Sequence, residues 1–199
     1  MKRNKLIIGL TGGSGCGKSV VAKAANDLGF VHIDTDKIGH EIILKPNKPY
    51  YELIEKFGEV ILSENGEIDR KKLGAIVFSD PEMLNVLNTI THPAITEKVK
   101  RMLDDYTVID GALLHKTPDI VDLCDYIIAV TNSDDRRIKF ICNRDNIDFE
   151  TAKKRISSQP DNSFYTDFSD IVIHSDCDIE ELYNKSIDVI KRCMSEKTV

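Results

Sequence analysis

The sequence lacks the features that mark a secreted, membrane-bound or zinc-binding chain. Its five cysteines are scattered along 199 residues and never form a Cys-x-x-Cys pair, which favours reduced thiols over a disulfide framework. No apolar stretch approaches the roughly 20 residues of a membrane span, and the first residues carry no leader-type cleavage region. The five histidines are dispersed, without the spacing of zinc ligands. We therefore expect a cytoplasmic protein with no membrane partner.

Positive charge is also scarce. Lys and Arg number 27 against 33 Asp and Glu, which gives a formal net charge of -6. Because proteins that bind nucleic acid without sequence preference neutralise phosphates with many Lys and Arg, we expect no nucleic acid partner. With 41% hydrophobic residues, the chain is long enough for one substantial core and too short for two ordinary domains.

The most informative segment is an apolar run over residues 6–11 that leads into a glycine-rich turn with Lys-Ser at its end. The pattern Gly-x-x-x-x-Gly-Lys-Ser is the spacing of a P-loop, whose backbone N–H groups converge on phosphate oxygens. We expect Lys18 to reach the β- and γ-phosphates of ATP and Ser19 to offer its hydroxyl to Mg²⁺. The expected nucleotide contacts are Gly12, Gly13, Ser14, Gly15, Cys16, Gly17, Lys18 and Ser19.

Strand-like runs alternate with helical patterns along most of the chain. This alternation predicts an α/β, three-layer P-loop NTPase fold, in which a parallel five-stranded sheet is covered by helices on both faces. The predicted strands are residues 5–11, 30–33, 107–110, 126–131 and 170–174.

Two segments stand apart from this alternation. Residues 46–106 hold no convincing strand but several helix-start signals, such as Asp69 and Asp80, and we expect an all-helical insert there. Residues 144–165 form a basic helical segment between the fourth and fifth strands, where a lid over phosphates would lie. We therefore expect one kinase domain over residues 1–199, whose core is made of residues 1–45 and 107–199.

Three carboxylates lie at the ends of predicted strands. Asp34 and Asp36 follow the second strand, and ligands of open α/β sheets sit at the carboxyl ends of strands, so we expect both acids to face the γ-phosphate. The alternative for Asp36 is a cap of the following helix. Asp110 ends the third strand, where an acid can hold Mg²⁺ directly or through water; the alternative is a turn residue.

Arginines in the basic segment are candidates for contacts with the transferring phosphoryl group. Arg often neutralises the negative charge of a transferring phosphoryl group, and we expect Arg144 to close over the phosphates. The alternative is an exposed ion pair between Arg144 and its neighbour Asp145, which would contribute little energy. Arg155 has the same two interpretations. Farther upstream, the His92-Pro93 pair by itself predicts the start of a helix with Pro in its first turn.

Taken together, these motifs resemble those of the dephospho-CoA kinase family from about residue 6 to residue 183. The glycine-rich loop is similar to the family's Gly-Leu-Thr-Gly-Gly-x-Gly-Ser-Gly-Lys-Ser, and Ile33-Asp34-Thr35-Asp36 is similar to its Asp-x-Asp motif. The other residues at family-like positions are Phe57-Gly58, Asp69-Arg70, Val77-Phe78, His92-Pro93, Arg144-Asp145, Ala152, Arg155-Ile156 and Gln159.

The resemblance implies ATP-dependent phosphorylation of the ribose 3′-hydroxyl of dephospho-coenzyme A, the last step of coenzyme A synthesis. It implies that Asp36 is the base, that Asp34 orients the sugar, and that the insert with His92 holds the pantetheine and diphosphate arm. The expected catalytic residues are then Lys18, Asp36 and Arg144, and the expected substrate contacts are Asp34, Asp36, His92 and Asp110. We expect the protein to act as a monomer.

The chain also departs from the family pattern, which leaves other functions open. One alternative is a different small-molecule P-loop kinase, and another is a nucleotide-binding protein with impaired catalysis. Mg²⁺-dependent ATP turnover with and without acceptors separates them, because a pure binder shows none. The departures are Gly39-His40 for Ala-Arg, His115-Lys116 where the family has Phe-Glu, Phe140 for an arginine, and His174-Ser175 for Asp-Asn.

Overall fold

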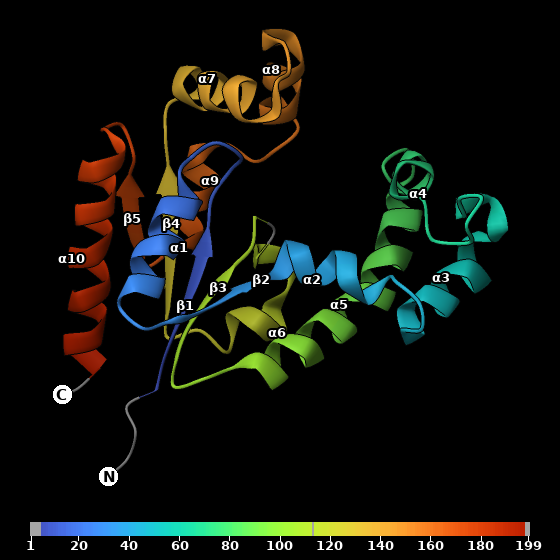
Figure 1. Cartoon of the computed structure of the whole chain (residues 1–199), viewed down its shortest axis with the longest axis horizontal. Coiled ribbons are helices and arrows are strands. Elements are labelled where there is room, and N and C mark those ends of the chain that lie inside the picture. The colour runs from blue at the N-terminus through green and yellow to red at the C-terminus, as the bar shows by residue number, and fades with distance from the viewer. Residues whose placement is uncertain (1–4, 113, 198–199) are drawn as a thin grey trace. The chain divides into compact units, whose positions relative to one another are not determined.

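A computed structural model describes residues 5–112 and 114–197 of the chain (Figure 1). The chain divides into two compact units, one made of Met1–Asp34 with Leu103–Val199 and the other of Thr35–Met102. Across the part of the chain that the structure describes, no helix is both long and apolar enough to cross a membrane.

The first unit is built on a five-stranded sheet whose strands are all parallel, in the order β2-β3-β1-β4-β5. Every residue of the central strand β1 is buried, which explains why its sequence is a continuous apolar run. The prediction of five parallel strands is confirmed, with each boundary within one residue. The strands are β1 (Leu6–Thr11), β2 (Val31–Asp34), β3 (Tyr106–Asp110), β4 (Tyr126–Thr131) and β5 (Ile171–His174).

Helices cover both faces of this sheet, so the three-layer prediction is confirmed. On one face α1 (Lys18–Asp27) and α10 (Ile179–Lys197) pack together and share a core with Leu10 and Val130 (Figure 1). On the other face η2 (Leu114–Lys116) lies against β1, and α9 (Asn162–Phe168) packs on β4. The short helix α6 (Pro118–Val121) packs against η2.

Between β4 and α9 the chain forms two helices that pack together, α7 (Asp134–Asp145) and α8 (Phe149–Ser157). Ile138 and Ile141 of α7 pack against Ala152 and Ile156 of α8 in a small core of their own. Asn146 joins the helices with a left-handed backbone, φ 52°, which ends α7. The predicted lid segment, 144–165, thus contains the end of α7, all of α8 and part of α9.

The second unit is made of helices. The longest, α5 (Pro81–Met102), packs against each of the other three, α2 (Thr35–Ile42), α3 (Lys48–Phe57) and α4 (Arg70–Val77). A 3-10 turn, η1 (Glu59–Ile61), and a single isolated bridge between Leu62 and Ile68 complete the unit. Asp69 caps α4 as predicted, because its Oδ1 accepts the backbone N–H groups of Lys71 and Lys72.

The prediction that His92-Pro93 starts a helix is wrong. Helix α5 runs without interruption from Pro81 through Pro93 to Met102. A proline inside a helix removes one backbone hydrogen bond and costs roughly 3 kcal/mol or more. Packing of α2, α3 and α4 along α5 offsets that cost, so tertiary contacts override a local signal that favours a helix start.

Candidate active site

The glycine-rich loop connects β1 to α1 and takes backbone conformations that require glycine. Gly12, Gly15 and Gly17 have φ values of 137°, 78° and 101°, a region that residues with a side chain rarely adopt. At Gly12 a Cβ atom would also lie 2.3 Å from the carbonyl oxygen of Val130. The spacing of glycines in the sequence therefore reflects both the turn itself and its close approach to β4.

The first turn of α1 offers several groups to an anion. Gly17 precedes the helix and has no side chain that could cap the first backbone N–H groups, so those groups point outward at the positive end of the helix dipole. Lys18 donates from Nζ to the carbonyl of Gly12 at 2.8 Å, which holds its ammonium group across the loop. Ser19 is exposed beside it. This arrangement agrees with the predicted phosphate site.

Asp34 and Asp110 end neighbouring strands at the carboxyl edge of the sheet. Asp34 of β2 pairs in register with Asp110 of β3. Asp110 also pairs in register with Leu10, which is one residue before the end of β1. Register partners on adjacent strands project to the same face, so both carboxyl groups lie on one face of the sheet at its carboxyl edge. Carboxylate and hydroxyl oxygens are the donors that Mg²⁺ prefers, so the chemistry of Asp34, Asp110 and Ser19 fits this ion.

His32 lies at the same edge of the sheet, beside Asp110. Its Nε2 lies 3.5 Å from Oδ2 of Asp110, and both side chains are largely buried. The neighbouring Asp110 carboxylate raises the pKa of His32 above its ordinary value, more than partial burial lowers it. Sequence reasoning did not single out this histidine, because it lies inside a predicted strand and its partner is 78 positions away.

Arg137 is a further residue that sequence reasoning missed. It lies in the first turn of α7, its side chain is 2% exposed, and its guanidinium donates to the carbonyl of Ser14 at 3.0 Å. It also donates to Asp134 at 2.9 Å and to the side-chain oxygen of Gln159 at 3.2 Å. The sequence could not identify it, since Arg136, Arg137 and Lys139 look alike on a charged helix and only packing shows which one is buried.

A cavity of about 330 Å³ lies beside the loop and α1. Ser175, one of the departures from the family pattern, donates its hydroxyl to the carbonyl of Cys16 at 2.6 Å and fixes the far side of the loop. Asn132 in turn donates its side-chain amide to the carbonyl of Ser175 at 3.2 Å. Phe140, another departure, lines the same cavity and is 43% exposed, so it offers a flat aromatic face where the family has an arginine.

Arg144 and Arg155 share one carboxylate. Arg144 donates to both oxygens of Asp145, at 2.7 and 3.0 Å, and Arg155 pairs with the second of these oxygens. The ion pair was the alternative interpretation of Arg144, and the structure contains it. Hydrogen bonding to Arg144, with a further contribution from Arg155, lowers the pKa of Asp145 to about 2.

We expect this low pKa to depend mainly on Arg144. Because the pKa of folded Asp145 lies below its ordinary value of 3.8, the pairs contribute stability above pH 3.8 and that contribution is lost as the pH falls through about 2. In Arg144→Ala the pKa should rise toward the ordinary value, and Arg155→Ala should raise it less. Carboxyl NMR titration of Asp145 measures both, and an unchanged pKa in Arg144→Ala would contradict the assignment.

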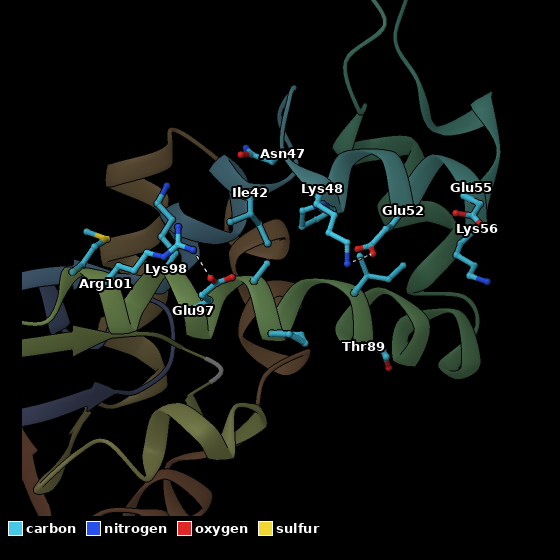
Figure 2. A pocket seen from close by; sticks show the side chains of 15 residues that line it. Ile42, Asn47, Lys48, Glu52, Glu55, Lys56, Thr89, Glu97, Lys98 and Arg101 are labelled. Carbon is cyan, nitrogen blue, oxygen red and sulfur yellow. Dashed lines mark hydrogen bonds and ion pairs between the residues drawn. The ribbon is translucent and has the colours of Figure 1, made fainter.

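The remaining predicted site residues, Asp36 and His92, belong to the second unit. Asp36 is exposed in the first turn of α2, and His92 is half-buried in the middle of α5. The larger cavity of this unit, about 880 Å³, lies along α5 (Figure 2). Three of the four cations that line it are paired: Lys48 with Glu52, Lys98 with Glu41, and Arg101 with Glu97.

A smaller cavity of about 240 Å³ lies among α2, α4 and α5. It is lined by apolar side chains and by Gly39 and Arg70, and it includes Phe78, which is 82% exposed. The Nη1 atom of Arg70 lies 3.4 Å from Nδ1 of His40. Where the family has Ala-Arg, this chain has Gly39-His40, and the guanidinium of Arg70 on α4 lies beside His40.

Comparison with known proteins places these features in one family. The family model described as dephospho-CoA kinase matches residues 6–181. A dephospho-CoA kinase of Fusobacterium nucleatum is 39% identical over 184 residues, which are 90% of this chain and 94% of that protein. A dephospho-CoA kinase of Carboxydothermus hydrogenoformans is 34% identical over 193 residues, 94% of this chain and 93% of that protein.

The fold leads to the same family. The solved structure of a dephospho-CoA kinase from Campylobacter jejuni superposes with a TM-score of 0.68 at 27% sequence identity. The match covers 97% of this chain and 98% of that one, so both units take part in the similarity.

Proposed function

Because the chain belongs to the dephospho-CoA kinase family, we propose a mechanism in which ATP lies on the loop of residues 12–19 and Asp36 receives the proton of the acceptor hydroxyl. The protein is an ATP-dependent kinase that phosphorylates the ribose 3′-hydroxyl of dephospho-coenzyme A to give coenzyme A. The observation that carries the mechanism is the loop itself, with its left-handed glycines and the Lys18 ammonium held across it.

The nucleotide is held by the first unit. Backbone N–H groups of the loop and the first turn of α1 bind the phosphates, and Lys18 neutralises charge on the β- and γ-phosphates. Ser19 and Asp110 are the residues that would hold Mg²⁺, which supplies further charge neutralisation when it is bound. The base of ATP enters the cavity beside the loop, where the exposed ring of Phe140 offers a surface for stacking.

The transfer needs a proton acceptor and correct orientation. Asp36 accepts the proton of the 3′-hydroxyl while the oxygen of that hydroxyl bonds to the γ-phosphorus. The bond between the γ-phosphorus and the β–γ bridging oxygen breaks, and ADP leaves. Asp34 orients the sugar. Two residues of chain span at most about 7 Å, so Asp36 is tethered close to Asp34 and to the carboxyl edge of the sheet. Arg144 releases Asp145 and meets charge on the transferring phosphoryl group.

The second unit contributes the acceptor specificity. We assign the diphosphate of dephospho-coenzyme A to Arg70 and His40, because three of the four cations that line the larger cavity are already paired with glutamates. His92 contacts the same arm of the substrate, and the segment of residues 46–106 acts as the substrate-binding insert. Residues 144–165 act as the lid of a single kinase domain. All of these residues come from one chain, and we propose a monomer that acts in the cytoplasm.

The test is product formation by the purified protein. The protein is incubated with Mg-ATP and dephospho-coenzyme A, and coenzyme A is followed by mass spectrometry, with a chelator added in a parallel reaction. Coenzyme A that forms only without the chelator supports both the reaction and the need for Mg²⁺. ATP binding without any product would favour a nucleotide-binding role, and ATP turnover with a different acceptor would favour another kinase.

A further inference from the structure

The phosphate loop is supported from its outer side by a buried cation. The guanidinium of Arg137 donates from Nε to the carbonyl of Ser14 at 3.0 Å, and the residue is 1% exposed. The Arg137 side chain also packs closely on Gly13, because a Cβ atom at Gly13 would lie 2.3 Å from Nη2 of Arg137. At Gly15 a Cβ atom would lie 2.8 Å from the carbonyl oxygen of Arg137. The start of α7 and the loop are therefore packed backbone against backbone.

Gln159 completes this support. Its side-chain oxygen accepts the backbone N–H of Ser14 at 2.8 Å and the Nη2 group of Arg137 at 3.2 Å. Its side-chain nitrogen donates to the hydroxyl of Ser14 at 2.9 Å. Arg137 and Gln159 thus bind the N–H, the carbonyl and the hydroxyl of Ser14, and Gln159 lies in the connection between α8 and α9.

We propose that Arg137 is a positioning residue that fixes the phosphate loop in its anion-binding shape and couples it to the segment over α7, α8 and α9. Its side chain bonds Asp134 of its own helix and two distant residues, Ser14 of the loop and Gln159 after α8, so one side chain ties these segments together. Its guanidinium also lies beside the loop in a buried environment, where its charge, partly offset by the ion pair with Asp134, adds positive potential to the phosphate site. Arg137 does this without contacting the nucleotide. The inference rests on the assignment of the loop to ATP.

Substitutions of Arg137 and Gln159 test this role. In Arg137→Gln the charge and two of the three hydrogen bonds are lost, and the Kd for ATP should rise by about 10- to 100-fold, as expected for loss of hydrogen bonds to a charged group. Arg137→Lys keeps the charge but cannot bond all three partners at once, so its Kd should be intermediate. Gln159→Leu should also weaken ATP binding. The matched control is Arg192→Gln, since Arg192 is 70% exposed on α10 and pairs with Glu196.

A positioning role also predicts which kinetic constant changes. The KM for ATP should rise in Arg137→Gln while the KM for the acceptor stays near its wild-type value. The thiol of Cys16, 1% exposed within the loop, should react faster with iodoacetamide in this variant, as measured by peptide mass spectrometry. Calorimetric titration with ATP needs no acceptor, so it decides this inference even where the protein fails to form coenzyme A.

The proposal is overturned if folded Arg137→Gln and Gln159→Leu bind ATP with the wild-type Kd. It is also overturned if both KM values and the Tm change in parallel, because Arg137 would then stabilise the fold without a particular effect on the loop. Where Arg137→Gln does not fold, Arg137→Lys and Gln159→Leu decide: weaker ATP binding in both supports the proposal, and wild-type binding in both rejects it.

Discussion

Asp36→Asn is expected to lower kcat by about 10² to 10⁴, the range that a general base contributes. The substitution keeps the size and polarity of the side chain but removes its ability to accept the proton of the acceptor hydroxyl. Because we propose that the loop and α1 hold the nucleotide, the Kd for ATP should not change. Steady-state assays of coenzyme A formation, together with calorimetric titration of ATP, measure the two quantities separately.

The control for this prediction is Asp188→Asn. Asp188 is an exposed carboxylate on α10, and its replacement makes the same change of charge and chemistry. It should leave both kcat and the Kd for ATP unchanged. Full activity of Asp36→Asn would remove Asp36 from the mechanism. The alternative role as a helix cap does not hold, because α2 already begins at Thr35, and Asp36 would then be an acidic residue of the first turn that favours the helix dipole.

The second large effect is expected at Gly12. Gly12→Ala should weaken ATP binding by about a hundredfold or more, because a left-handed residue with a side chain carries roughly 1–3 kcal/mol of strain. The added methyl group would also lie 2.3 Å from a backbone carbonyl oxygen of β4, and that oxygen cannot rotate away as a side chain would. The loop must shift to accommodate it. Calorimetric titration with ATP measures the loss.

Gly29→Ala provides a matched control for the Gly12 substitution. Gly29 also has a left-handed backbone, φ 90°, but a Cβ atom built there has no neighbour within 4 Å. The change should cost some stability from backbone strain alone and leave the Kd for ATP as in the wild type. If Gly12→Ala also binds ATP normally, close packing of the loop against β4 has no role in nucleotide binding.

Local patterns predicted the fold well because each core strand of this protein is one short, continuous apolar segment of the sequence. Apolar runs bounded by glycine and aspartate gave all five strands, and cap residues such as Asp69 gave the helix starts. The failure at Pro93 has a clear cause. A proline predicts a helix boundary only where local preferences determine the backbone conformation. Here packing against three other helices keeps α5 helical through Pro93.

The candidate site was predicted unevenly for a similar reason. The loop from Gly12 to Ser19 is continuous in sequence, so its spacing alone identifies it. Arg137 contacts Ser14 across 123 positions, and its selection from several nearby cations depends on burial. His32 meets Asp110 only because β2 and β3 are neighbours in the sheet. Contacts between distant segments leave no periodic signal in the chain.

The second unit occupies a particular place in the topology. It leaves the sheet after β2 and returns before β3, and these two strands are parallel neighbours. Parallel neighbours always need a crossover, which an ordinary α/β protein makes with about a dozen residues. Here that crossover has expanded into a helical unit from Thr35 to Met102. On our proposal that this unit binds the acceptor, exchange of one contiguous stretch would change which molecule is phosphorylated and leave every strand pairing and the loop of residues 12–19 unaltered.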